Sequence, residues 1–529
     1  MEEPNITPSF TGDIPTVENE IISNCVIHFR PDQNWNGSEY GFDWIRIGDS
    51  NMPVDQNNVN HHYANLMGKY YGFGNLPTTL HIGPKPSVIK TMRWGVCDDL
   101  NDWRKMTVTN NPTTFKNEIA LYRDLVSRYF HKRLTISWKM GKPSICPASL
   151  DADIKTEIDN TQYTYYVPVM TLMLDKTANL KMLCELNPSD PPPTKVEIFE
   201  KLEVGESPCF EFLNGTEKKD NPSDMTKYSL DVKCIDTFSE EKLIEAYATY
   251  PDGTKKLCGQ LRVLPNYDVL KLNILLIEVH IDGIGNPGRI AVTAQDEVIL
   301  KRILGQAMID VTHRETYLFK LSSTNYPVFY NKIVGYTDTS PHITGRFFPR
   351  KHENHIAGPI SAAFNQHLSS RGETQRYANY IKILIMDIPC KSPIMDNGGN
   401  YTGRDDQANG VTYYDSGYII LYRDRGNDTY AHEMLHALGL AHPYVGKELD
   451  KNALYTYKAR TTDNIMDYSH QIGITRKTTW QWQWSIERSH VRQQQNKERK
   501  RITAEAVERA KNTIKPLPLP KPAILLPRP

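Results

Sequence analysis

The sequence predicts a multidomain protein in which β-rich N-terminal modules precede an α/β (α+β) domain that ends in a long helix. Three observations lead to this fold class. The chain has 529 residues, well beyond the size at which a single hydrophobic core stops growing. Short alternating apolar runs, separated by turn residues, fill the first half of the chain. After residue 265, longer apolar runs alternate with helical patterns.

Charge and hydropathy limit the partners that the chain is expected to have. Lys plus Arg and Asp plus Glu both total 62, so the field of the whole chain favours neither nucleic acid nor an anionic membrane as partner. No segment has about 18 continuous apolar residues, so we expect no membrane span. Residues 1–22 are expected to form a flexible N-terminus and lack the basic stretch and apolar run of a standard export signal.

The eight cysteines favour no metal site of their own. The first seven precede residue 260, only Cys390 follows, and no Cys-x-x-Cys pair exists, which argues against a cysteine zinc site. Their scattered spacing favours buried thiols, with a disulfide framework as the alternative.

Two β-rich modules are predicted before residue 266. Residues 23–150 contain strand-like runs and a helical pattern near residues 117–130, which indicates a β-rich module. Residues 151–265 contain recurrent alternating runs with turn residues between them, which indicates a β-sandwich-like module. We expect few contacts to cross residue 265, so that a fragment beginning near Asn266 folds alone.

The third domain is expected to span residues 266–490. Residues 269–281 predict a buried strand and residues 293–310 predict a helix behind it. Further strands are predicted at residues 316–321, 380–388, 411–414 and 418–423. Residues 396–410, rich in Asp, Asn and Gly, predict a turn-rich loop. Residues 491–529 complete the chain with a polar helix, whose pattern begins at residue 480, and a Pro-rich tail.

One short segment carries most of the chemistry that the sequence reveals. Residues 428–442 contain a His-Glu-x-x-His pattern extended to a third histidine. The residues of this pattern that can bind a metal or transfer a proton are His432, Glu433, His436 and His442. Histidines four apart lie on one helix face with Cβ atoms about 5 to 6 Å apart, so the first two can reach a single metal ion. Glu433 then lies beside the metal without binding it.

The end of this helix brings in the third ligand. Asp428 is the expected N-cap, and Gly439 can take the positive φ that ends the helix and turns His442 toward the metal. Three protein ligands leave one position open for water, as in catalytic rather than structural zinc sites. The alternative is that these are ordinary helix histidines, but the full pattern arises by chance in roughly one of tens of thousands of such chains.

The segment resembles the metzincin clan of zinc peptidases, and its His442-Pro443 ending is similar to that of serralysins. Metzincins have a methionine-containing turn below the metal, and Met466 follows His442 by 24 residues. Tyr468 resembles the tyrosine of astacins and serralysins that can bind the zinc and swing away. Read alone, Met466 is a core residue and Tyr468 is a packed aromatic.

This resemblance implies a zinc peptidase domain with Zn²⁺ as cofactor. It also implies that Glu433 is the general base, that Met466 lies in the structural Met-turn, and that Tyr468 is a catalytic residue that donates a hydrogen bond to the oxyanion formed from the scissile carbonyl. Residues 410–415 fall where metzincins have the edge strand that pairs with substrate. The implied activity is that of a metalloendopeptidase acting on extended protein or peptide segments.

The resemblance leaves the biological role open. The β-rich modules and the absent export signal suggest a bacterial effector that is cytoplasmic at first and is then secreted or injected by a signal-peptide-independent export apparatus, and residues 40–44 are similar to segments of such proteins. One alternative is a binding or adhesion protein with a non-catalytic zinc domain. Another is a structural part of a secretion machine.

Two weaker signals have structural interpretations. His352 and His355, with His342 nearby, are expected in a solvated loop rather than in a second metal site. Three alternating tryptophans at residues 480–484 are expected to pack the final helix onto the domain.

Overall fold

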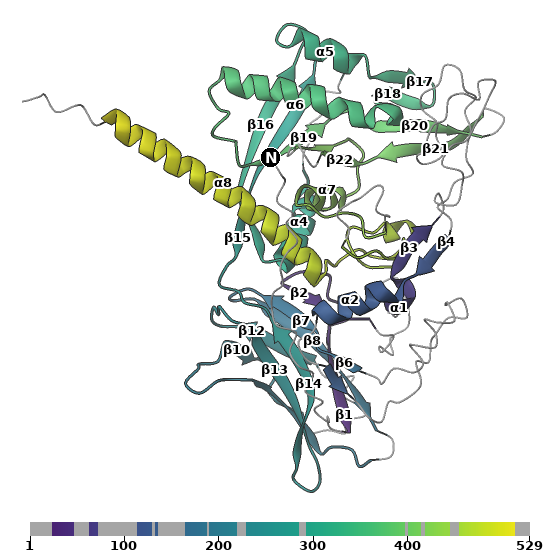
Figure 1. The fold of residues 1–529 in the computed structure, drawn as a ribbon. Coiled ribbons are helices and arrows are strands. Elements are labelled where there is room, and N and C mark those ends of the chain that lie inside the picture. The colour runs from purple at the N-terminus through teal and green to yellow at the C-terminus, as the bar shows by residue number, and fades with distance from the viewer. Residues whose placement is uncertain are drawn as a thin grey trace, which may run out of the picture.

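The computed structural model describes most of the chain. The described residues are 24–46, 63–71, 114–129, 133–135, 164–187, 190–218, 229–284, 292–396, 400–413, 418–444 and 454–513. Residues 1–22 and the Pro-rich tail after residue 513, for which the sequence predicts flexibility, lie outside them. The described part is a multi-sheet α+β protein with a β-sandwich below a mixed sheet that carries helices on both faces (Figure 1).

The sandwich consists of a four-stranded and a six-stranded sheet. The first has the order β1 (Cys25–Pro31), β8 (Thr177–Leu186), β12 (Ser229–Cys234) and β10 (Phe210–Phe212). The second has the order β11 (Glu217–Lys218), β9 (Lys195–Glu200), β13 (Lys242–Thr249), β14 (Lys255–Val263), β7 (Val169–Leu172) and β2 (Tyr40–Asp43). Alternate residues of β12 are buried, as expected for a strand with one face on a core. Both sheets contribute to one apolar cluster, which includes Phe29, Leu180 and Ile244.

The sandwich takes strands from both of the modules that the sequence predicts. β1 pairs antiparallel with β8, and β2 pairs antiparallel with β7. The boundary expected at residue 150 therefore runs through both sheets. Local patterns did not reveal this, because strand pairing over more than 100 residues leaves no periodic signal in the sequence.

Several short elements lie beside the sandwich. They are α1 (Tyr63–Leu66), β3 (Gly68–Tyr71), β4 (Thr114–Asn117), α2 (Ile119–Tyr129), β5 (Arg133–Thr135) and β6 (Thr164–Tyr166). Side chains of α1 and α2 share an apolar cluster with Tyr457, Trp480 and Trp482, which come from far along the chain. The helix predicted near residues 117–130 is α2.

The mixed sheet has the strand order β16, β15, β19, β23 and β22. These strands are β16 (Ile309–Leu321), β15 (Leu270–Ile281), β19 (Ile381–Met386), β23 (Tyr418–Leu421) and β22 (Gly410–Tyr413). All pairs are parallel except β22 with β23, so the edge strand β22 runs antiparallel to the rest. The strand predicted at residues 269–281 is β15.

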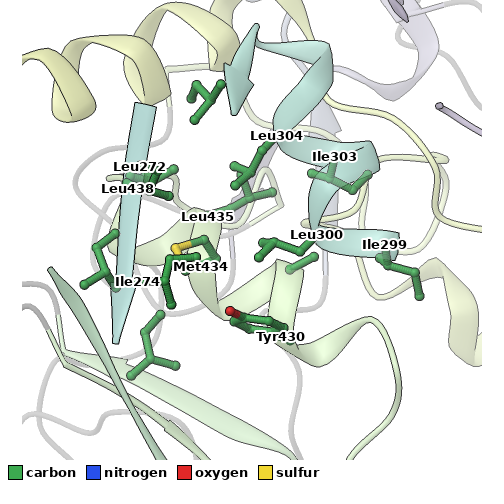
Figure 2. Packing of buried hydrophobic residues seen from close by; sticks show 14 of the residues in the cluster. Leu272, Ile274, Ile299, Leu300, Ile303, Leu304, Tyr430, Met434, Leu435 and Leu438 are labelled. Atoms are coloured by element: carbon green, nitrogen blue, oxygen red, sulfur yellow. The ribbon is translucent and has the colours of Figure 1, made fainter. Parts of the chain in front are cut away.

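Helices cover both faces of this sheet. One face packs against α4 (Ala294–Gln306), α7 (Thr429–Ala437) and α8 (Gln481–Thr513). Figure 2 shows Leu300 and Leu304 of α4 facing Leu435 of α7, beside Ile274 of β15. The other face packs against α5 (Pro327–Val334) and α6 (Glu353–Ser370). The second half of α8 extends past the sheet (Figure 1), and the expected boundary at residue 490 lies inside this helix.

Two predictions for the connecting segments are wrong. Residues 396–410 are not only a loop, because β21 (Tyr401–Ala408) pairs with β20 (Cys390–Met395) in a hairpin. His352 and His355 lie in η3 (Arg350–His352) and at the start of α6, rather than in a loop. The remaining elements are β17 (Asp338–Ser340), β18 (Ile343–Phe347) and η4 (Ser469–Ile472).

The sandwich and the mixed sheet meet through buried polar contacts. The buried Gln306 donates from Nε2 to the carbonyl oxygen of Gly37 at 3.0 Å. The backbone carbonyl oxygen of Gln306 accepts from Oγ1 of Thr171 at 2.7 Å. The buried Arg46 pairs with Asp463 at 3.4 Å. The expectation that few contacts cross residue 265 is therefore wrong, since these buried side chains have partners on both sides of that boundary. No helix among the described residues is long and apolar enough to cross a membrane.

Candidate metal centre

Helix α7 holds the first two histidines of the motif and is short, nine residues, and deeply packed. His432 and His436 face the same side, as their spacing predicts, and both are buried. The helix ends at Gly439, whose φ is +87°. A Cβ atom at this position would lie 2.3 Å from Cε1 of His490 in α8, so glycine is needed for space as well as for φ. The chain then returns His442 to the other two histidines, as the sequence predicts.

The three imidazoles meet through their Nε2 atoms. Nε2 of His442 lies 3.1 Å from Nε2 of His432 and 3.1 Å from Nε2 of His436. The ligand atoms of these residues, called here the histidine triad, all lie within 4.8 Å of one another. The triad can hold a metal ion, and it is the one group of three such side chains found in the described part of the chain.

Two backbone carbonyls fix the orientation of the rings. Nδ1 of His432 lies 3.0 Å from the carbonyl oxygen of Ile465, and Nδ1 of His436 lies 2.7 Å from that of Leu440. A carbonyl only accepts, so each Nδ1 is the donor and each neutral ring keeps a lone pair on Nε2. The Nε2 lone pairs of His432 and His436 can therefore serve as ligands for one cation.

Burial keeps these rings neutral. It lowers the pKa of His436 to about 4, against a smaller opposing effect of the hydrogen bond to Leu440. Burial lowers the pKa of His442 to about 2, with further contributions from His436 and Arg476. The pKa of His432 is lowered well below its ordinary value, again mainly by burial. Neutral imidazole is the form that binds a metal ion.

The turn below the triad is tied to α8. The fully buried Met466 belongs to the same apolar cluster as Leu435 of α7. Its backbone N–H donates to Oδ1 of Asn464 at 3.0 Å, and Nδ2 of Asn464 donates to Oε1 of Gln483 at 2.7 Å. Met466 thus directly follows Ile465, whose carbonyl oxygen accepts from His432, and is held by a side-chain pair that the sequence analysis missed.

Arg476 is a second residue that sequence reasoning missed. Its Nη1 donates to the carbonyl oxygens of Ile465 at 3.1 Å and Asp467 at 2.9 Å. The Ile465 carbonyl therefore accepts from both Arg476 and the ligand ring of His432. Arg476 also pairs with Asp428. Asp428 occupies the N-cap position but makes no capping hydrogen bond, because its carboxylate binds this arginine instead of a backbone N–H.

Aromatic rings cover one side of the triad. The ring centroid of Tyr468 lies 5.8 Å from that of His432 and 5.2 Å from that of His442. Tyr444, which the sequence analysis did not single out, lies 5.2 Å from His442 and 5.5 Å from Tyr468. Tyr444 could have been predicted as part of the site from its position two residues after His442.

Glu433 lies on α7 beneath the edge strand β22. Its carboxylate oxygen Oε2 accepts from Oγ1 of Thr412 at 2.7 Å. The side chain is 7% exposed, so the acid is nearly enclosed. His352 and His355, by contrast, lie outside this site with Nδ1 atoms 3.5 Å apart.

Comparisons with known proteins add little to this geometry. No family model matches the chain, and no curated protein matches it. Among solved structures, a sialyltransferase from Photobacterium damsela matches at 11% sequence identity and a TM-score of 0.12, over 42% of this chain and 42% of that chain. A likeness at that TM-score carries no argument about the fold or the activity.

Proposed function

We propose that the chain is a zinc-dependent endopeptidase of the metzincin type. The observation that carries the proposal is the convergence on one point of three imidazoles, two of them buried and one half-buried, with a nearly enclosed glutamate that directly follows the first of these histidines and is not a member of the triad. A purely structural zinc site has four protein ligands and no need for a nearby acid. Three ligands leave a position at which chemistry can occur.

The donor set fits zinc. Two nitrogen ligands at tetrahedral zinc are separated by about 3.3 Å, which follows from bond lengths of about 2.0 to 2.1 Å. The Nε2 separations of 3.1 Å in the histidine triad are close to this value. Neutral imidazole is a suitable ligand for zinc, as it is for copper, nickel and iron. When bound, zinc supplies Lewis-acid chemistry, polarising the scissile carbonyl and acidifying water.

The residues around the triad have separate roles in peptide hydrolysis. Glu433 takes the proton of the attacking water and passes it to the leaving amine. Tyr468, whose ring lies against two rings of the triad, donates a hydrogen bond to the oxyanion that forms. Met466 supports the triad from below without touching the substrate.

The edge strand β22 supports an extended protein or peptide segment as substrate. Among the described strands, β22 pairs with β23, and none pairs with its other edge. Such an edge binds an extended peptide through main-chain hydrogen bonds. Delivery by an export apparatus as an injected or secreted effector is the biological role that we propose for this activity.

The alternative is a binding or secretion-machine protein in which the zinc domain is not catalytic. Tyr468 argues against it, because its ring packs against two rings of the triad without being a member of it, and so does Glu433, which directly follows His432 and is not a member either. A metal site with only a structural role needs neither side chain.

Metal analysis combined with a peptide-library cleavage assay tests the proposal. We expect about one zinc ion per chain, cleavage of the library, loss of cleavage after chelation, and recovery on addition of zinc. Full cleavage by a protein stripped of metal would contradict the proposal.

A further inference from the structure

We propose that Thr412 is a positioning residue for the general base, whose hydroxyl holds the Glu433 carboxylate from the edge strand β22. The inference rests on the proposed function, since it assigns a role in the same site. It adds a residue that neither the motif nor the metal-binding geometry includes. It also makes one strand both the expected docking edge for the peptide and the support for the acid.

The packing of β22 on α7 brings these two residues together. Gly410 and Thr412 are two apart on a strand, so they face the same side. A Cβ atom at Gly410 would lie 2.8 Å from Cγ of Glu433 and 3.1 Å from Cγ2 of Thr429. The missing side chain at Gly410 therefore makes room for the stem of Glu433. Thr412, one step further along the same face, meets the carboxylate.

The hydroxyl of Thr412 has two acceptors within reach. Its Oγ1 lies 2.7 Å from Oε2 of Glu433 and 2.9 Å from the backbone carbonyl oxygen of the same residue. A hydroxyl carries one proton and therefore donates to one of these oxygens at a time. With an ionised carboxylate the proton points to Oε2, which makes a charge-assisted hydrogen bond.

The same hydroxyl can also hold the protonated acid. In the proposed reaction Glu433 takes the proton from water on its other oxygen, Oε1, and passes it on from there, while the Thr412 hydroxyl goes on donating to Oε2. Oγ1 and Oε2 stay in contact in either state, so the acid does not have to find a new partner between taking up the proton and releasing it.

Thr412→Val and Thr412→Ser separate this role from packing. Valine keeps the shape and removes the hydroxyl, whereas serine keeps the hydroxyl and removes a methyl group. We expect Thr412→Val to lower kcat about tenfold, since general-base catalysis as a whole contributes about 10² to 10⁴. KM and zinc content should stay at wild-type values, and Thr412→Ser should recover most of the rate. Thr316→Val is the matched control, because it makes the same substitution at an exposed position of the strand β16, away from Glu433.

A double-mutant cycle on stability provides a readout that needs no activity. Thr412→Val and Glu433→Ala, alone and together, are compared by their unfolding equilibrium constants. Coupled residues give non-multiplicative effects, and we expect a deviation of about threefold or more. Multiplicative effects, or a wild-type kcat in Thr412→Val, would overturn the inference. A wild-type chain that binds zinc, shows the coupling and cleaves no peptide would instead overturn the proposed function.

Discussion

At the scale of single residues, Tyr468 is the group whose role depends most on one atom. Its ring lies against His432 and His442, so the side chain belongs to the immediate surroundings of the histidine triad. Tyr468→Phe removes that hydroxyl and keeps the ring contacts. An oxyanion donor matters more in the transition state than in the ground state. We therefore expect kcat to fall by about 10²-fold with KM and zinc content little changed. Cleavage at the wild-type rate would assign the ring to packing alone.

Glu487 is a buried acid outside the proposed reaction. It lies on α8, is fully buried, and neither carboxylate oxygen has a hydrogen-bond partner among the described residues. Burial raises the pKa of Glu487 from 4.5 to about 8, against a smaller opposing effect of Arg488. The folded protein therefore holds a proton here over a pH range in which the unfolded chain has released it.

This proton has a predictable effect on stability. Because the folded pKa is the higher one, the free energy of unfolding falls as the pH rises from 4.5 to about 8. Glu487→Gln mimics the neutral acid and removes this dependence. We expect the variant to match the wild type near the lower pH and to exceed its stability near the upper one. Denaturant unfolding at both pH values measures the difference, and Glu203→Gln at an exposed position is the control. An equal pH dependence in wild type and Glu487→Gln would show that Glu487 ionises normally.

At the scale of secondary structure elements, the contact between α7 and α8 positions the third ligand. Gly439 ends α7 with a φ of +87°, and the His490 ring of α8 occupies the space that a side chain would need. Gly439→Ala meets both obstacles, so we expect it to lower the free energy of unfolding by about 1 to 3 kcal/mol. Zinc affinity should fall as well, because the turn carries His442 back to the triad.

Gly305→Ala provides the matched control for this exchange. Gly305 lies in α4, where an added Cβ meets no atom within 4 Å. Alanine is the better helix former, so we expect a gain of about 0.5 to 1 kcal/mol. Equal effects of the two substitutions in denaturant unfolding would contradict the account of the α7 end.

The elements also show what the sequence can predict. The strand β15 and the helix α4 follow from local apolar patterns. The helix α7 and the triad follow from the spacing of the histidines and from the glycine that ends the helix. The hairpin β20–β21 was missed because β21 is mostly exposed and polar, so its strand character depends on its partner. Arg476 and Thr412 were missed for a similar reason, since their partners lie 48 and 21 residues away.

At the scale of the whole molecule, the sandwich and the mixed sheet behave as one structure rather than as separable modules. Gly41 lies so close to α4 that an added Cβ would be 2.5 Å from the carbonyl oxygen of Gln306. Oδ2 of Asp43 accepts from the backbone N–H of Gln481 at the start of α8, at 3.0 Å. The N-terminal region therefore supports the same helix whose Gln483 accepts from Asn464, two residues before Met466.

This arrangement predicts the outcome of truncation. Removing residues 1–265 takes Gly37 and Thr171 from Gln306 and Arg46 from Asp463. Each lost hydrogen bond contributes about 0.5 to 1.5 kcal/mol, and the apolar contact of Val169 with the cluster of the mixed sheet is lost as well. We expect the fragment 266–529 to lose cooperative unfolding, measured by circular dichroism on heating. A fragment that melts cooperatively within a few degrees of the full chain would contradict this and favour the separable domain that the sequence predicts.

We propose that the histidine triad holds a zinc ion and that Glu433 acts as general base without binding the metal. Zinc content and cleavage of an unfolded protein, measured side by side on the full-length wild type and Glu433→Ala, test it most directly. We predict about one zinc ion per chain in both proteins and a loss of nearly all cleavage in the variant. Loss of zinc from Glu433→Ala, or cleavage by it at the wild-type rate, would contradict the account.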